Sequence, residues 1–251
     1  ISTKNGGSGN PHRVHYVTGA TVQNTPIVDT DSLLDSPNDN FCTLNPLDKE
    51  DKITLSNGNL KAVGTNNQYG YCRGTLAASS GKYYFEVAFN GNQAIGTGWT
   101  DANGELRTAG ANNDTLLGQD YWNAVYAYNG IFVFIKSNQV YTQAGNASDG
   151  DVFGCAVDMD TKYVWFSYNG TWLGTGTQDP STGQGGWYVD NLKNATPFFS
   201  DGAGSQVPEG TFNFGQIPWA YTPPTNFLSL STASLPEPDI ANGSTQFKAV
   251  L

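Results

Sequence analysis

The sequence predicts an all-β protein built as an antiparallel sandwich of two sheets. Its composition disfavours helices: of 251 residues, 30 are glycine and only 14% are charged, and good helix formers gather in no long run. Asn-Gly pairs begin at Asn57, Asn129 and Asn169, each between runs that alternate apolar and polar residues, and such pairs favour hairpin turns. The short runs follow one another with no helical pattern between them, which is typical of a sandwich.

The N-terminal part predicts extended structure and turns. Residues 1–30 are polar and rich in Gly, Asn and Thr, and we interpret them as an extended segment or linker. Residues 31–48 are rich in turn formers, and Pro37 and Pro46 break any helix there. The sequence begins with Ile, and we expect the natural polypeptide to be longer.

The predicted sandwich spans residues 31–217. Its strand candidates lie at 52–63, 83–89, 94–100, 124–136 and 152–174. The last of these is the segment richest in aromatic residues, and its residues alternate in character from one position to the next. Since one face of each strand must be buried, we interpret this segment as core hairpins. A ligand platform at Trp165 or Phe166 is the less favoured interpretation.

The C-terminal segment, residues 218–251, is predicted to be extended. Five of the twelve prolines fall between positions 218 and 240, so this part cannot enter the middle of a sheet. We expect it to lie along the domain surface and lead outward. The last residues begin a new alternating pattern, which suggests that a further domain follows.

Charge and cysteine content exclude several classes of function. The net charge of −10 argues against binding to nucleic acid or to anionic membranes, because phosphate binding needs clustered Lys and Arg. No apolar run approaches the ~20 residues of a membrane span. Cys42, Cys72 and Cys155 are odd in number and widely spaced, so they predict reduced core residues rather than a disulfide framework or a zinc site.

Four segments taken together resemble a known family. In order, they are SSGKYYFEVAF, AIGTGWT, DGDVFGCAVDMDTKYVWFSYNGTWLG and ATPFFSDG. They contain the patterns G-x-x-Y-x-E-V from Gly81 and G-D-x-x-G-x-x-x-D from Gly150. In this order they resemble the SPRY domain, over about residues 70–217. The resemblance implies a concanavalin-like β-sandwich that serves as a binding and structural module, with partner contacts on loops at one end.

The flanking segments resemble a bacteriophage version of this domain. They are DSPNDNFCTLNPLD before the domain and FNFGQIPWAYTPPTNFLSLSTASLPEPDI at its end. This resemblance implies a virion protein of a tail fibre, head fibre, spike or decoration. Its expected partners are other virion proteins and a host-surface glycan or protein, and its expected location is the virion surface. Fibres and spikes suggest a homo-oligomer, with a trimer favoured by analogy alone.

Two alternatives remain open. A carbohydrate-active enzyme would need two carboxylates at a defined separation, and the clustered E-x-D-x-x-E pattern of concanavalin-like hydrolases is absent. Glu86 falls on the strand face that we expect to be polar, and the aspartates near 149–151 and 158–160 are explained by turns. We therefore expect no enzyme, no cofactor and no metal, although the oxygen-rich turns leave calcium open. The second alternative is a cellular SPRY adaptor that recognises short peptides.

Aromatic residues outside the predicted core strands are the candidates for ligand binding. A ring beside amide and carboxylate groups is the usual arrangement of a sugar site. The candidates are Tyr69, Tyr71, Tyr121, Trp122, Trp187 and Tyr188. The competing interpretation is that they close the ends of the sandwich, because aromatic burial dominates core energetics.

Overall fold

The computed structural model describes residues 40–65, 69–90, 95–104, 122–136, 138–202 and 207–236. The chain divides into two units, 1–33 and 34–251, and every described residue belongs to the second. The predicted N-terminal segment therefore lies outside the described residues, as do the last residues of the chain. The described part offers no helix with the length and apolar character of a membrane span.

Strands dominate the described residues. They are β1 (Leu44–Lys49), β2 (Thr54–Ser56), β3 (Lys61–Val63), β4 (Tyr69–Gly74), β5 (Lys82–Asn90), β6 (Ile95–Asp101), β7 (Trp122–Ala127), β8 (Ile131–Ile135), β9 (Asn138–Gln143), β10 (Val152–Asp158), β11 (Tyr163–Tyr168), β12 (Thr171–Trp172), β13 (Trp187–Tyr188), β14 (Ala195–Gly202), β15 (Glu209–Asn213) and β16 (Leu228–Ser229).

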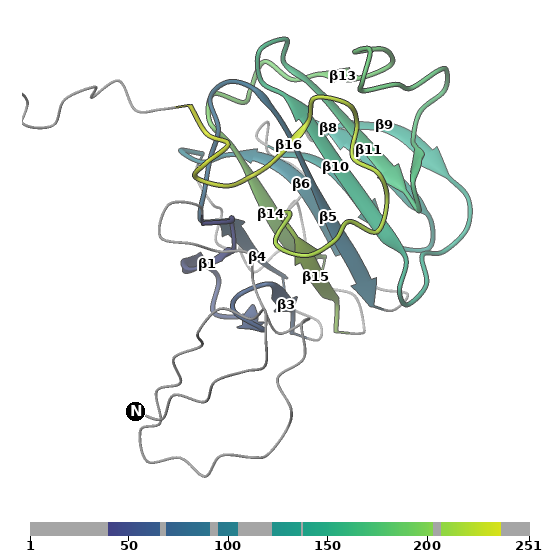
Figure 1. Ribbon diagram of the computed structural model, residues 1–251. Coiled ribbons are helices and arrows are strands. Elements are labelled where there is room, and N and C mark those ends of the chain that lie inside the picture. Colours follow the sequence, from purple (N-terminus) through teal and green to yellow (C-terminus); the bar gives the residue numbers. More distant parts are fainter. Residues whose placement is uncertain are drawn as a thin grey trace, which may run out of the picture. The chain divides into compact units, whose positions relative to one another are not determined.

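These strands form two sheets, and Figure 1 labels most of the strands. One has the order β1-β4-β14-β6-β7-β8-β9. The other has the order β12-β11-β10-β5-β15-β3-β2, with β13 beside β11 and β16 beside β5. All strand pairs are antiparallel except β16 with β5. The predicted fold class, an all-β antiparallel sandwich, is confirmed.

The main core lies between the two sheets. It is rich in aromatic side chains, with Phe85 of β5 packed edge-to-face on Trp99 of β6 at a centroid distance of 5.0 Å. At the end of β15, Phe212 stacks on the same Phe85 ring and Phe214 packs against it at a tilt. Phe166 of the aromatic-rich segment is fully buried in this core, as its alternating pattern predicts.

The three Asn-Gly pairs all occupy turns, with positive φ at each asparagine and each glycine. Asn169-Gly170 alone forms the two-residue connection, between β11 and β12, with φ of 47° and 76°. These angles match a type I′ turn, which needs positive φ at both central residues. The pairs at Asn57 and Asn129 lie in longer connections, and Asn59 adds a third left-handed residue to the first of them.

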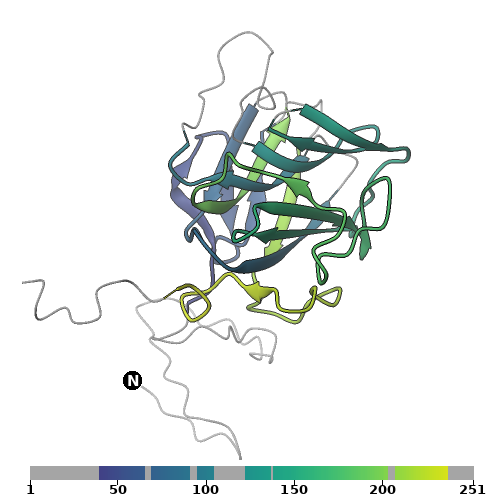
Figure 2. The same ribbon diagram turned by 90° about the horizontal axis from the view of Figure 1, so that it is seen from above.

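The segment 218–230, called the strap below, runs along the outer face of the nine-stranded sheet. Figure 2 shows it in yellow, outside the sandwich and next to the dark blue β5. Its Trp219 ring lies 5.2 Å from that of Tyr84, and its Phe227 ring lies 6.1 Å from that of Trp165. With Ala156, these side chains form a second hydrophobic cluster on the outside of the sheet.

Glu86 holds the strap in place from the middle of β5. Its carboxylate accepts hydrogen bonds from the backbone N–H groups of Ala220 at 2.8 Å and Tyr221 at 2.9 Å, and from the hydroxyl of Tyr84 at 3.0 Å. Glu86 is only 2% exposed. The expectation of a polar face at Glu86 is therefore wrong, because the strap buries this face and supplies the donors that a buried carboxylate needs.

Candidate functional site

Three of the six predicted ligand-binding residues have side chains outside the described part of the chain. Tyr69 begins β4 and Trp122 begins β7, but only their backbone is described. Tyr121 lies wholly outside the described residues. The structure places Tyr71, Trp187 and Tyr188 in full, and they lie in different environments.

Tyr71 is a buried residue of the seven-stranded sheet. It packs with Phe198 and Ala124 in a small cluster separate from the main core, and it is 4% exposed. Burial, followed by the nearby Glu50 carboxylate, raises the pKa of Tyr71 well above its ordinary value. Its ring has almost no surface to offer a ligand.

Trp187 and Tyr188 are neighbours in β13, so their side chains point to opposite faces of the sheet. The Trp187 ring is half-buried and lies against Phe166 at 6.2 Å and Tyr141 at 6.5 Å. Tyr188 is 54% exposed, with the edge of Tyr163 at 5.6 Å and the Lys136 ammonium 6.0 Å from its ring centre. Of the predicted candidates with described side chains, these two are therefore accessible.

A hollow of about 280 Å³ lies beside Trp187, where β9 at the edge of one sheet faces β13 and the loop 174–186 of the other. We call it the edge hollow. It is lined by Val140, Tyr141, Gly174, Thr175, Gly176, Thr177, Gln178, Gly185, Gly186 and Trp187. None of these residues carries a charge at neutral pH. The lining therefore combines an aromatic ring with neutral hydrogen-bonding groups.

The loop beside the hollow is built around Asp179. The Asp179 carboxylate accepts hydrogen bonds from the Ser181 N–H at 3.0 Å and from the Thr182 hydroxyl at 2.9 Å. The backbone of Asp179 exchanges hydrogen bonds with that of Gln184. On the outer face of the sheet, the indole N–H of Trp165 donates to the Gln184 carbonyl at 2.8 Å. Hydrogen bonds therefore connect residues within the loop and fix the loop to the sheet that the strap covers.

Two positions of this loop require glycine, because neighbouring atoms lie too close to leave room for a side chain. A side chain at Gly185 would bring its first carbon within 2.4 Å of the Thr177 carbonyl, and Gly185 also has a φ of +69°. At Gly186 the same atom would meet the Trp165 ring at 2.5 Å. Gly176 differs, since an added side chain would find open space within 4 Å. The inner wall of the loop is therefore closely packed, whereas Gly176 lies at an open rim.

Several polar groups of the edge hollow have no partner within the described residues. These groups are the indole N–H of Trp187 and the hydroxyls of Thr175 and Thr177. The Gln178 amide, by contrast, lies against the backbone of Gly176. Thr175 and Thr177 are exposed, so their hydroxyls face solvent and can bond to a polar ligand that lies against the Trp187 ring.

The carboxylates that could suggest catalysis are engaged in structural hydrogen bonds. Asp151 accepts from the Ser148 N–H, the Tyr168 hydroxyl and the Asn169 side-chain amide. Asp158 accepts from two turn N–H groups and pairs with Lys82 at 3.1 Å. Within the described part of the chain, His, Cys, Asp and Glu side chains form no group of three or more suited to a metal ion.

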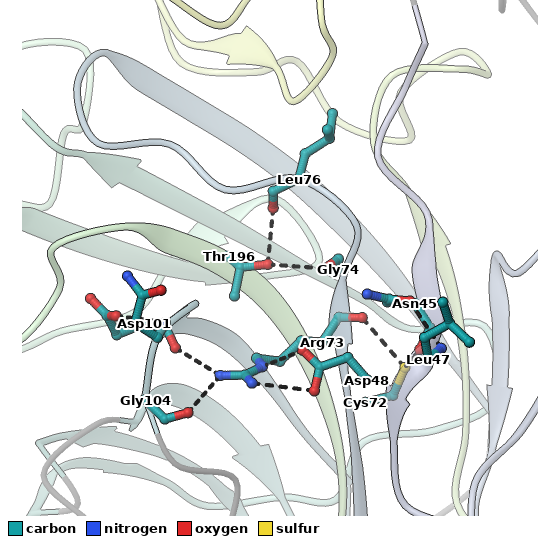
Figure 3. Close-up of polar contacts among 11 residues, drawn as sticks. Asn45, Leu47, Asp48, Cys72, Arg73, Gly74, Leu76, Asp101, Gly104 and Thr196 are labelled. Atoms are coloured by element: carbon teal, nitrogen blue, oxygen red, sulfur yellow. Dashed lines mark hydrogen bonds and ion pairs between the residues drawn. The ribbon is translucent and has the colours of Figure 1, made fainter.

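Arg73 is the centre of a polar cluster that is drawn in Figure 3. Its guanidinium donates twice to the Asp48 carboxylate, at 2.7 and 3.2 Å. It also donates to the carbonyls of Asp101 at 3.1 Å and Gly104 at 2.8 Å. The Asp101 carboxylate in turn accepts backbone N–H groups, among them that of Asn194 at 3.0 Å. This cluster joins β1, β4 and β6, and its charged groups are occupied by one another.

The three cysteines are buried and unpaired, as the sequence predicts. Burial raises the pKa of the Cys42 thiol to about 11 and that of the Cys72 thiol to about 12. Burial also raises the pKa of Cys155 well above its ordinary value. Thiols that stay protonated at neutral pH are poor nucleophiles, so none of the three resembles a reactive cysteine.

Residues 82–188, from β5 to β13, match the family model of the SPRY domain. This part of the chain is similar to a SPRY domain. The match includes the edge hollow and the loop 174–186, and it excludes the strap. SPRY domains mediate protein–protein interactions, so the match is consistent with a protein partner.

Individual proteins are similar to this chain in part of their sequence or in fold. The chain is 27% identical over 191 residues to the ATP-dependent RNA helicase DDX1 of Xenopus laevis, covering 76% of this chain but only 23% of the helicase. Its fold is similar to the SPRY domain of human HERC1, with a TM-score of 0.50, 13% identity and coverage of 70% and 99% of the two chains. It is also similar to the TRIM65 PSpry domain, with a TM-score of 0.52, 11% identity and coverage of 69% and 90%.

Sequence reasoning identified Trp187 but missed the other walls of its hollow. Val140 and Tyr141 lie in an edge strand, and Thr175 and Thr177 lie in a Gly-Thr repeat. Only the glycines around Trp187 gave a local signal, and they indicated a flexible loop rather than a shaped surface.

Proposed function

We propose that this chain is a non-catalytic SPRY module of a bacteriophage virion appendage, such as a tail fibre, head fibre, spike or decoration. It contacts other virion proteins and the host surface, and it works as part of a homo-oligomer on the particle. The observation that carries the binding role is the edge hollow, an uncharged and accessible site within the residues that match the SPRY model.

Two features support a structural role without catalysis. Among the described residues, the carboxylates of Asp151, Asp158 and Glu86 bond to turns, to Lys82 and to the strap, which supports a structural role for these three groups. The strap adds a second hydrophobic layer to the sandwich, which suits a module exposed on a particle surface.

The virion assignment rests on the phage-like segments that flank the domain. The described part of the second segment, residues 212–236, continues from β15 into the strap, whose packing on β5 makes it part of the domain. A virion module that is repeated along a chain would need a C-terminal segment that packs on its own domain in this way.

Mass spectrometry and cryo-electron microscopy of purified particles test this proposal. We expect peptides of this sequence, in stoichiometric amounts and within an oligomeric appendage, in particles of the phage whose genome encodes it. A chain that is missing from the particles but present in cell extracts would overturn the proposal.

A cellular SPRY adaptor is the second candidate, favoured by the similarity to part of the RNA helicase DDX1. In that case the chain would belong to a larger cellular protein and would bind a short peptide. Co-purification from cell extracts, with no signal in particles, would favour this candidate.

A further inference from the structure

We infer that the edge hollow binds one neutral sugar unit, with the Trp187 ring as its platform. This inference rests on the proposed function, because it names the ligand class for the site on which that function depends. Four properties of the hollow lead to it: its size, its lack of charge, its unpaired polar groups and its rigid wall.

The size of the hollow limits the ligand to a single ring. Its volume of about 280 Å³ lies just below the ~300 Å³ at which sites for drug-sized molecules begin. A folded peptide loop would not enter, whereas one pyranose unit would. The open rim at Gly176 lets the rest of a longer glycan continue into solvent.

The lack of charge disfavours ionic ligands. No lining residue offers a countercharge, and a buried unpaired ion is strongly disfavoured. The net charge of −10 further repels anions from the whole surface. A phosphorylated, sulphated or carboxylated ligand would therefore bind poorly.

The unpaired polar groups disfavour a purely apolar ligand. An aliphatic side chain in the hollow would cover the hydroxyls of Thr175 and Thr177 and the indole N–H of Trp187 without pairing them. A sugar ring has an apolar face that can lie against the indole and hydroxyls that can bond to its neighbours. Neutral sugar is thus the ligand class that satisfies both parts of the lining.

The wall of the hollow is ordered before any ligand arrives. The Asp179 turn and the Gln178–Gly176 contacts fix the loop on one side, and Phe166 supports the Trp187 ring from behind. A preformed site loses little entropy when it binds, which matters for a ligand as small as one sugar.

The test uses nuclear magnetic resonance on the intact chain with neutral methyl glycosides of glucose, galactose, mannose and N-acetylglucosamine. The indole N–H of Trp187 is the reporter, assigned with the variant Trp187→Phe. We expect at least one glycoside to shift this signal saturably, with a Kd of about 1–10 mM. The indole N–H of Trp165, which is bonded to Gln184, serves as the internal control and should not shift.

Two variants and one control locate the site. Gly176→Leu fills the open rim and should abolish the shift, and Thr177→Val should weaken binding about tenfold. Thr222→Val, on the exposed strap, should bind as the parent does. Methyl glucuronide matches methyl glucoside except for its carboxylate, and it should not bind.

The inference fails if no neutral glycoside shifts the Trp187 signal, or if Gly176→Leu leaves the shift unchanged. It also fails if the glucuronide binds as well as the glucoside. These outcomes leave the virion proposal intact, since particle analysis tests that proposal separately. Saturable glycoside binding by a chain that is absent from particles would support the inference and overturn the virion proposal.

Discussion

Two aromatic regions of this sandwich touch the loop 174–186, and they use their polar groups differently. Under the strap, the indole of Trp165 donates to Gln184 and the Glu86 carboxylate accepts three hydrogen bonds. In the edge hollow, the indole of Trp187 and the hydroxyl of Thr177 have no partner among the described residues. The first region is closed by the chain itself, and the second is open.

This difference teaches that aromatic density is a poor guide to a binding site. The most aromatic stretch of the sequence, 151–174, supplies core and strap contacts, and its Trp165 is 1% exposed. Trp187, which lines the edge hollow, lies outside that stretch, next to a loop of small neutral residues. Unpaired polar groups, rather than the number of rings, distinguish the open region from the closed one.

The largest effect should come from breaking the closed region at Glu86. Glu86→Ala leaves the N–H groups of Ala220 and Tyr221 without an acceptor, and we expect a loss of about 3 kcal/mol in the free energy of unfolding. Urea unfolding followed by circular dichroism measures this loss. The matched control is Glu209→Ala, which removes a surface ion pair with Lys61 and should cost less than about 1 kcal/mol. Equal losses for the two variants would show that the strap is not held by Glu86.

A smaller difference in the free energy of unfolding should distinguish substitutions of Trp165 and Trp187. Trp165→Phe removes the indole hydrogen bond to the Gln184 carbonyl, which keeps only the Asp179 N–H as donor, and it opens space in a buried cluster, so we expect a loss of about 2 kcal/mol. Trp187→Phe removes no hydrogen bond within the described residues and keeps a ring against Phe166, so about 1 kcal/mol or less should be lost. Urea unfolding compares the two variants. A larger loss for Trp187→Phe than for Trp165→Phe would show that Trp187 is the core residue.

The closed region shows which parts of the fold the sequence could predict. Strands and turns follow from local patterns, such as the alternation around Cys155 and the left-handed Asn169-Gly170 pair. The burial of Glu86 could not be predicted locally, because its donors lie 134 and 135 residues further along the chain. A strand alone does not reveal whether a distant segment will cover its outer face.

The open region was only partly predictable for a similar reason. Trp187 and Tyr188 could be found because they follow a glycine run outside the strand pattern. Their neighbours Val140 and Tyr141 come from an edge strand more than forty residues earlier, and only the folded sandwich brings them together. A shaped surface between two sheet edges has no signature in one segment of sequence.

Acid should weaken the side of the molecule beneath the strap and leave the edge hollow unaffected. Burial raises the pKa of Asp151, but hydrogen bonds from Tyr168 and Asn169 outweigh it, so the folded-state pKa lies below the ordinary 3.8. The pKa of Asp158 is lowered in the same way by its turn and by Lys82, which again outweigh burial. A carboxyl group with a lowered pKa stabilises the fold above its unfolded value, and this contribution is lost as the pH falls through the folded one.

We therefore expect the urea midpoint to stay level near neutral pH and to fall below pH 3.8. Asp151→Asn should be less stable than the parent at neutral pH and should lose less on acidification. Glycoside affinity in the edge hollow, which has no carboxylate, should not change between neutral pH and the onset of acid unfolding. Affinity that titrates in this range would place a carboxylate at the binding site.

The smallest effect on stability should come from filling the edge hollow. A side chain at Gly176 meets open space and the position needs no left-handed backbone, so Gly176→Leu should change the free energy of unfolding by less than about 0.5 kcal/mol. Thr177→Val should be equally mild, because its exposed hydroxyl bonds to no described residue. A large loss in either variant would mean that the hollow is part of the core. Unchanged stability with altered binding would show that this edge of the sandwich is free to serve a ligand.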